Sequence, residues 1–138
     1  MQYNGLKSDF NCFAKFVFIY ETIIKKMNKE VEFNQLSSNA LYLFKHELQK
    51  NMKYAKVSEI ENTPKQTKQT LFFTKKKCQI LDFCRHLRNS FSHGLLKKEN
   101  NIIIIPDINR NYYSSKGFLE YRVTKEFIIE IINDFEST

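Results

Sequence analysis

Three side chains suited to phosphate chemistry stand close together in the sequence, at Arg88, Asn89 and His93. An arginine stays charged at neutral pH, and its planar fork of N–H groups matches a phosphate with two hydrogen bonds. An imidazole exchanges a proton near neutral pH, so His93 can act as a base. Asn89 and His93 are four residues apart, a spacing that lets two side chains touch on a helix. The three residues therefore predict a site for a phosphate or a phosphodiester.

One amphipathic helix is predicted to carry all three residues. Successive residues of an α-helix advance by 100°, which places an apolar stripe on the side away from Asn89. This stripe consists of Ile80, Cys84, Leu87 and Phe91. Gly94 is the predicted stop, because a residue in the left-handed conformation just after a helix carries no steric penalty when it is glycine. His93 then lies in the last turn, where the helix dipole favours a protonated imidazole.

The segment FCRHLRNSFSHG resembles the signature of the HEPN superfamily, which has an Arg, a polar residue that is usually Asn, a short spacer and a His at a helix end. Arg88, Asn89 and His93 match it residue by residue. With the hairpin and last helix that follow, the whole chain is similar to a small plasmid- and phage-associated bacterial HEPN group. The resemblance implies a single domain over residues 1–138, a mainly α-helical bundle of about four main helices with a small β-hairpin before the last helix.

The same resemblance implies a metal-independent endoribonuclease that acts in a toxin role or in conflict with phages and plasmids. His93 would remove the 2′-hydroxyl proton, Arg88 would stabilise charge on the phosphate, and Asn89 would orient one of them or the ribose. The nucleophile comes from the RNA, so no metal or cofactor is expected. Family members pair as two-fold homodimers whose motif helices face one cleft. Further substrate contacts are then expected from Arg85, His86 and Ser90.

Structural roles for the same residues are the main alternative. His93 can serve only to cap carbonyl groups at the helix end, and Arg88 can pair with Asp82, Glu99 or another carboxylate. The chain would then be a non-catalytic dimerisation or interaction module that binds RNA, a nucleotidyltransferase-like protein or another protein partner, whereas a toxin would be expected to have an antitoxin as its partner. A DNA-binding regulator ranks last, because the sequence has no tight helix-turn-helix with a glycine turn.

The composition fits one folded domain with a basic surface. The chain has 138 residues and a formal net charge of +7, which favours nucleic acid or an acidic partner, although a merely lysine-rich, soluble surface explains it equally well. Three cysteines and no secretory signal indicate a reduced cytosol. The spacing of Cys78, Cys84 and His86 fits no common zinc site. No apolar run is long enough to span a membrane.

The periodicity of apolar residues predicts the elements around the motif. Helices are expected over about 9–28 and from Ser37 or Ser38 to about 54, a buried strand over 102–105, a turn at 116–117, a second strand over 118–123 and a last helix capped by Thr124. The two strands are predicted to pair as an antiparallel hairpin with a long, Asn/Tyr/Ser-rich loop.

The start of the motif helix is the least constrained boundary. Thr63-Pro64 is a plausible start because proline suits the first helical position, but a start between Thr70 and Thr74 is preferred for the well-packed part. A basic run at residues 75–77 stands beside it. A solvated helical turn is the simpler interpretation of this run, and a phosphate track leading to Arg85 and Arg88 is the functional one.

Overall fold

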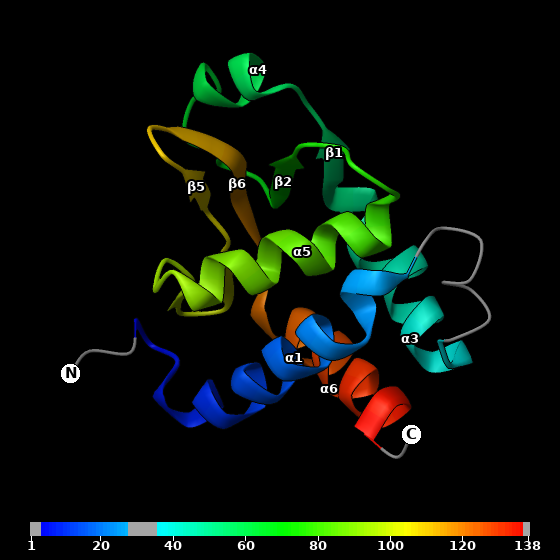
Figure 1. The fold of residues 1–138 in the computed structure, drawn as a ribbon. Helices are drawn as coiled ribbons and strands as arrows, with labels where there is room; N and C mark the ends of the chain where they lie inside the picture. Colours follow the sequence, from blue (N-terminus) through cyan, green and yellow to red (C-terminus); the bar gives the residue numbers. More distant parts are fainter. Residues whose placement is uncertain (1–3, 28–35, 137–138) are drawn as a thin grey trace.

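The chain folds into helices and a mixed β-sheet (Figure 1), and the computed structural model describes residues 4–27 and 36–136. The helical elements are η1 (Lys7–Asp9), α1 (Phe10–Thr22), η2 (Ile24–Lys26), α3 (Ser38–Tyr42), the π-helical turn η3 (Leu43–Leu48), η4 (Gln49–Asn51), α4 (Val57–Glu61), α5 (Gln79–Ser92) and α6 (Tyr121–Glu136). The strands are β1 (Met52–Tyr54), β2 (Thr70–Phe73), β3 (Lys97–Glu99), β4 (Ile102–Ile104), β5 (Asp107–Asn109) and β6 (Tyr112–Glu120).

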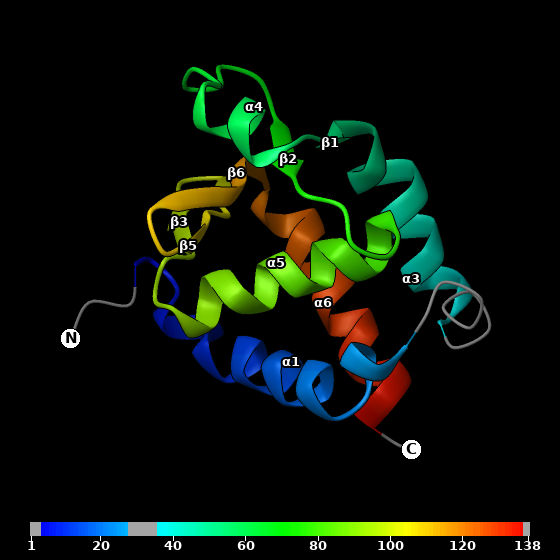
Figure 2. The ribbon, with the colours of Figure 1, turned by 45° about the horizontal axis from the view of Figure 1, so that its top comes forward.

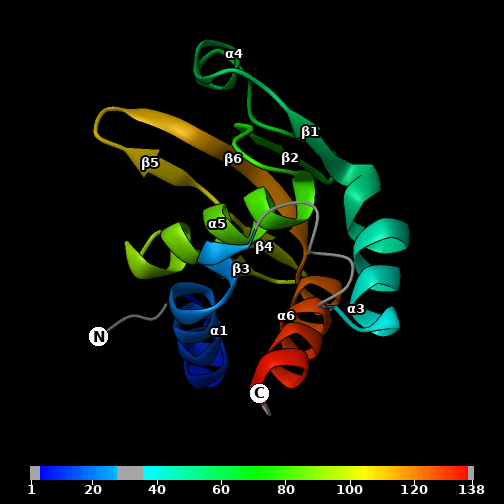
Figure 3. The same cartoon turned by 45° about the vertical axis from the view of Figure 1, so that its right-hand side comes forward.

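Strand β6 organises the sheet. The strand order is β1-β2-β6-β4-β3, and β5 pairs with the first part of β6. Only β1 and β2 run parallel; the other pairs are antiparallel. Ile103 of β4 lies opposite Leu119 of β6, which confirms the predicted antiparallel pairing of these two segments. Figure 3 shows α1, α5 and α6 on one side of the strands and the short helix α4 on the other.

The six-stranded sheet shows that the prediction of a mainly α-helical bundle is wrong. The protein is not all-α, and its fold is α/β. The strand β2 lies where the motif helix was predicted to begin. Leu71 and Phe73 of β2 are buried and alternate with half-buried Thr70 and Phe72, which is the period of a strand. Four apolar residues are too few to separate a strand from a helix by sequence pattern.

The segment of residues 106–117 was expected to be a loop and a turn, and that expectation is also wrong. It contains β5 and most of β6, and the reversal between them lies at Arg110, which has a positive φ of 62°. Gly117 sits inside β6 opposite Leu71 with a φ of 132°. A Cβ at this position would lie 2.1 Å from the carbonyl oxygen of Thr70, so the glycine permits close strand approach.

Other predicted boundaries shift by a few residues. Ser37 caps α3 as expected, because its Oγ accepts a hydrogen bond of 3.2 Å from the amide of Ala40. Thr124 does not cap α6, which begins at Tyr121; its hydroxyl instead donates to the carbonyl of Glu120. A helix start at Thr63-Pro64 is wrong, since the helix in that polar segment is α4.

The core lies between the sheet and the helices α1, α3, α5 and α6. Figure 2 shows α5 crossing between the strands and the pair α1 and α6. The largest fully buried side chains are mostly aromatic or branched: Phe13, Phe16, Phe73, Phe83, Phe127, Leu48, Ile60, Leu71, Leu87, Leu96, Ile103 and Ile105. Helix α5 is therefore held on both sides, and its polar residues are fixed by what they meet there. No helix in the described part of the chain has the length and apolar character needed to cross a membrane.

Candidate functional site

The first turn of α5 is tied to the loop that precedes it. Asp82 is 1% exposed, and its carboxylate accepts hydrogen bonds of 3.0 Å from the amides of Lys76 and Lys77. The hydroxyl of Tyr54 donates to the same carboxylate at 2.9 Å. Asp82 thus fixes the backbone of the basic run, which is not helical but bends into α5. The Nζ of Lys77 then donates to the carbonyls of Lys25 and Met27 at 2.9 and 2.7 Å.

The last turn of α5 ends as the sequence predicted. Gly94 has a φ of 71°, and its amide bonds to the carbonyl of Phe91 at 3.0 Å. The amide of Leu95 reaches the carbonyl of Ser90 at 2.8 Å, which completes a Schellman motif. Backbone amides therefore satisfy these terminal carbonyls, so His93 is not needed as their cap. The His93 side chain is exposed and makes no hydrogen bond to the described residues.

Arg88 is placed between α5 and α1. Its Nη1 donates to the Oδ1 of Asn89 at 2.8 Å, and its Nε lies 2.6 Å from the Oε1 of Glu21 in α1. The Nε–H does not point at a hydrogen-bond acceptor in the described residues, so the Glu21 contact is an ion pair without a hydrogen bond. The side chain is 28% exposed. A carboxylate thus pairs with Arg88, as the structural alternative required, but it is Glu21 rather than Asp82 or Glu99.

Asn89 and His86 bind one carboxylate from the sheet. Asp107 of β5 accepts from the Nδ2 of Asn89 at 3.1 Å and lies 2.8 Å from the Nδ1 of His86. Burial raises the pKa of Asp107, but the hydrogen bonds from His86 and Asn89 outweigh it, so this pKa lies below its ordinary value. The Nε2 of His86 faces the carbonyl of Thr74 at 3.2 Å. Both ring nitrogens of His86 are therefore engaged inside the protein.

The six predicted site residues thus separate into two groups. His86 and Ser90 are 0% exposed, at the interface of α5 and the sheet, where a substrate cannot reach them. Arg85, Arg88 and Asn89 line a pocket, and His93 is exposed one turn beyond Asn89. The polar face of α5 is covered by its own β5 and α1, so it does not need a second copy of the chain. A homodimer of facing motif helices therefore stays a prediction.

The pocket lies between α1, α5 and the bend before α5, and it has a volume of about 230 Å³. Five cationic side chains line it against two carboxylates. The cations are Lys25, Lys76, Lys77, Arg85 and Arg88, and the carboxylates are Asp82 and Glu21. We call these seven residues, with Asn89, the basic pocket. The excess of positive charge in a partly enclosed space favours an anion.

Arg85 also has an unsatisfied guanidinium donor in the basic pocket. Its Nη2 donates to the carbonyl of Thr74 at 3.3 Å and lies 3.5 Å from the Oδ1 of Asp82. Its Nε is buried without a hydrogen-bond partner among the described residues. A buried donor without a partner is unfavourable, and an anion oxygen would relieve it.

The sequence missed the partners that come from other elements. Glu21 lies near the end of α1 and Lys25 lies in η2, but no local sequence pattern aligns these elements with α5. Asp107 was assigned to a loop. The basic run gave a usable signal, because two of its three lysines line the pocket as the phosphate-track interpretation required. Its third member, Lys75, lies over the ring of Tyr54, 5.6 Å from the centroid.

Comparisons with family models, with curated proteins and with solved structures found no match to this chain. The HEPN resemblance accordingly rests on the motif residues alone. Within the described residues, no group of three or more His, Cys, Asp and Glu side chains is arranged to hold a metal ion.

Proposed function

We propose that this protein binds RNA through the basic pocket and cleaves it at the end of α5 without a metal. The observation that carries the proposal is the convergence of five cationic side chains, contributed by η2, the bend before α5 and α5 itself, on one pocket, with an exposed histidine at the end of the same helix. A phosphodiester supplies the anion that the pocket favours, and RNA supplies the 2′-hydroxyl that a histidine base can use.

Arg88 is the proposed phosphate ligand. The contacts within the described residues use its Nε and Nη1, which leaves Nη2 for a phosphate oxygen. Asn89 holds the guanidinium on one side and is itself held by Asp107, so the fork has a fixed direction. Such pre-positioned charge stabilises the extra negative charge of a pentacoordinate transition state. Asn89 is therefore a positioning residue in this proposal rather than a base.

His93 is the proposed general base. It lies one turn of α5 beyond Asn89 and has no side-chain hydrogen bond within the described part of the chain, so its ring is accessible to an RNA strand. The ring nitrogen takes the 2′-hydroxyl proton, the oxygen forms a bond to phosphorus, and the bond to the 5′-oxygen breaks. The departing 5′-oxygen takes a proton from solvent. The products are a 2′,3′-cyclic phosphate and a 5′-hydroxyl.

The test is incubation of the purified protein with total tRNA and mRNA in EDTA, followed by mapping of the RNA ends. We expect cyclic-phosphate ends with the wild type and none with Arg88→Ala. Lys50→Ala is a matched control, because Lys50 is exposed and lies outside the basic pocket. Absence of cleavage by a folded wild type would contradict the proposed reaction.

A second candidate is a non-catalytic RNA-binding module, and the Glu21–Arg88 ion pair favours it. This pair occupies part of the guanidinium and ties α1 to α5, which is what a structural arginine would do. In that case the wild type binds RNA with a strong salt dependence and releases it uncut. A binding assay run beside the cleavage assay separates the two candidates. A role in toxin or anti-phage activity, with an antitoxin or nucleotidyltransferase-like partner, is proposed only on the motif resemblance.

A further inference from the structure

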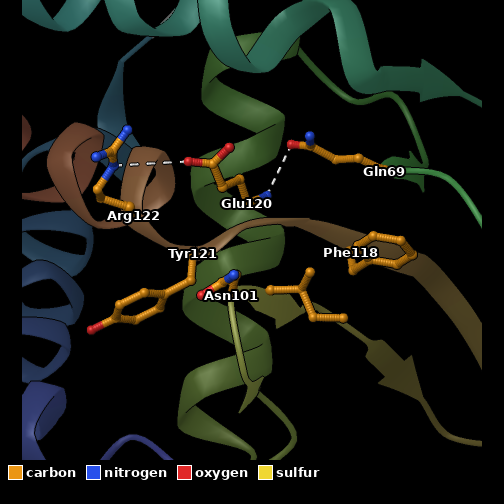
Figure 4. A pocket seen from close by; sticks show the side chains of 7 residues that line it. Gln69, Asn101, Phe118, Glu120, Tyr121 and Arg122 are labelled. Carbon is orange, nitrogen blue, oxygen red and sulfur yellow. Dashed lines mark hydrogen bonds and ion pairs between the residues drawn. The ribbon is translucent and has the colours of Figure 1, made fainter.

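The opposite face of the sheet carries a second pocket, which the proposed function does not use. It has a volume of about 520 Å³, within the size range of small-molecule sites. Its lining comes from the end of β6, the start of β4, the start of α6 and the residues before them: Gln69, Asn101, Ile102, Phe118, Glu120, Tyr121 and Arg122. Figure 4 shows these side chains from close by.

The outer face of the sheet is only partly covered. Along β6, the side chains of Ser115 and Leu119 are buried toward the helices, so Lys116, Phe118 and Glu120 point outward. The Nζ of Lys116 donates to the carbonyl of Thr63, directly after α4, so α4 covers that end of the face. The other end, around Phe118, is left half-buried and forms the floor of the pocket.

The floor of the pocket is apolar. Phe118 lies opposite Ile104 of β4 on one side and opposite Thr70 of β2 on the other. Ile102, which also lines the pocket, lies opposite Glu120. An aromatic side chain on an exposed sheet face is a stacking platform for a planar ring, and nucleic-acid bases are recognised in this way.

The rim is polar and offers both donors and acceptors. The Oε1 of Gln69 accepts from the amide of Glu120 at 2.9 Å, which turns the Gln69 amino group away from that amide. Asn101 brings a second carboxamide from the opposite side of the pocket (Figure 4). The carboxylate of Glu120 and the Nε of Arg122 are 3.9 Å apart, and the arginine side chain is 80% exposed. This loose pair presents an acceptor beside a donor at the edge of the floor.

We infer that the sheet-face pocket binds a nucleobase, and guanine best. Guanine is planar, so it can stack on Phe118. Its Watson–Crick edge presents two adjacent N–H donors, which suit the two carboxylate oxygens of Glu120, next to a carbonyl acceptor, which suits Arg122. Adenine lacks that arrangement of donors and acceptor. The base can come from a free nucleotide or from a single-stranded RNA, and both share this chemistry.

The test is a solution NMR titration of the 16.5 kDa protein with GMP and, separately, AMP. The side-chain amide resonances of Gln69 and Asn101 report directly on the pocket. We expect GMP to shift them and AMP to bind more weakly. Phe118→Leu keeps an apolar side chain but removes the aromatic face, so it should raise the Kd for GMP at least tenfold. Glu120→Gln should abolish the preference for GMP over AMP.

Phe72→Leu is the matched control, because Phe72 is also a half-buried phenylalanine on the outer face of the sheet but does not line the pocket. Its GMP affinity should equal that of the wild type. The RNA arm uses His93→Ala protein, which should leave a guanine-containing oligoribonucleotide intact. A response to the oligonucleotide alone assigns the base to an RNA strand, and a response to GMP alone assigns it to a free nucleotide.

The nucleobase site does not depend on the ribonuclease proposal, because the amide resonances of Gln69 and Asn101 report on the sheet-face pocket and not on the basic pocket. If neither GMP nor the oligonucleotide moves the two amide resonances in folded protein, the nucleobase site does not exist. Equal weakening of GMP binding by Phe118→Leu and Phe72→Leu would also overturn it, because the effect would then come from the sheet and not from stacking.

Discussion

The two histidines of the α5 motif lie seven residues apart in very different surroundings. His86 is fully buried, with one ring nitrogen 2.8 Å from Asp107 and the other against Thr74. His93 is exposed, with no side-chain hydrogen bond to the described residues. A histidine whose two nitrogens are engaged holds elements together, whereas one with free nitrogens can exchange protons with a substrate. The first half of the motif therefore builds the site, and its last residue is the one available for chemistry.

The largest expected effect is a loss of RNA cleavage activity when the exposed histidine, His93, is replaced. His93→Ala should lower the RNA cleavage rate by about 10²–10⁴-fold, the usual contribution of a general base, and should leave the thermal unfolding midpoint unchanged. His46→Ala is the matched control, because His46 of η3 is exposed and its ring packs 4.5 Å from the ring of Tyr42 in α3. Full activity in His93→Ala would remove His93 from the mechanism.

The next effect concerns stability. Asp107→Ala leaves His86 and Asn89 without their shared acceptor in a buried position, so we expect the free energy of unfolding to fall by about 3–5 kcal/mol. Urea denaturation followed by circular dichroism measures it. Asp134→Ala is the control, since the Asp134 carboxylate is only partly buried and accepts a hydrogen bond of 3.0 Å from the amide of Ser37. A loss as small as in the control would mean that the buried network contributes little.

The stability of the protein should fall in acid because of the same buried network. The pKa of Asp107 is lowered in the folded state from its ordinary value of 3.8, so its ionised form stabilises the fold at pH values above the ordinary pKa. That contribution should be lost as the pH falls below about 4, through the folded pKa. Unfolding midpoints measured between pH 7 and pH 2 should therefore drop more steeply for the wild type than for Asp107→Asn. Parallel curves would contradict this assignment.

The smallest expected effect tests the basic pocket alone. Lys76→Ala should weaken RNA binding modestly and reduce the slope of log K against log salt by about 0.7, the value for one phosphate contact of a single strand. Lys53→Ala is the control, because Lys53 is exposed on β1 and lies outside the pocket. Filter binding at several salt concentrations measures both slopes. An identical slope for the wild type and Lys76→Ala would exclude Lys76 from the interface.

The parts of the site that were predictable from the sequence are those governed by local rules. The helical period and Gly94 fix the motif helix and its stop, and the isoleucine run fixes β4. The parts that were missed depend on contacts between distant segments. Thr70–Phe73 becomes a strand because β6 and β1 pair with it. From the sequence alone, Gly117 predicts a turn, because its neighbour in the sheet, Leu71, is not known. Without the sheet, Asp107 has no reason to meet His86, so the buried half of the motif could not be recognised.

The position of β6 has a consequence for how the chain is made. Strands β2, β4 and β5 all pair directly with β6, and β1 and β3 reach the sheet only through β2 and β4. Yet β6 spans Tyr112–Glu120 in a chain of 138 residues. During synthesis, the edges of β2, β4 and β5 that pair with β6 therefore stay open until β6 has been made. A messenger cut short before this strand therefore yields a product in which nothing joins the β1-β2 pair to the β3-β4 pair, and the strand edges left exposed make that fragment prone to aggregate.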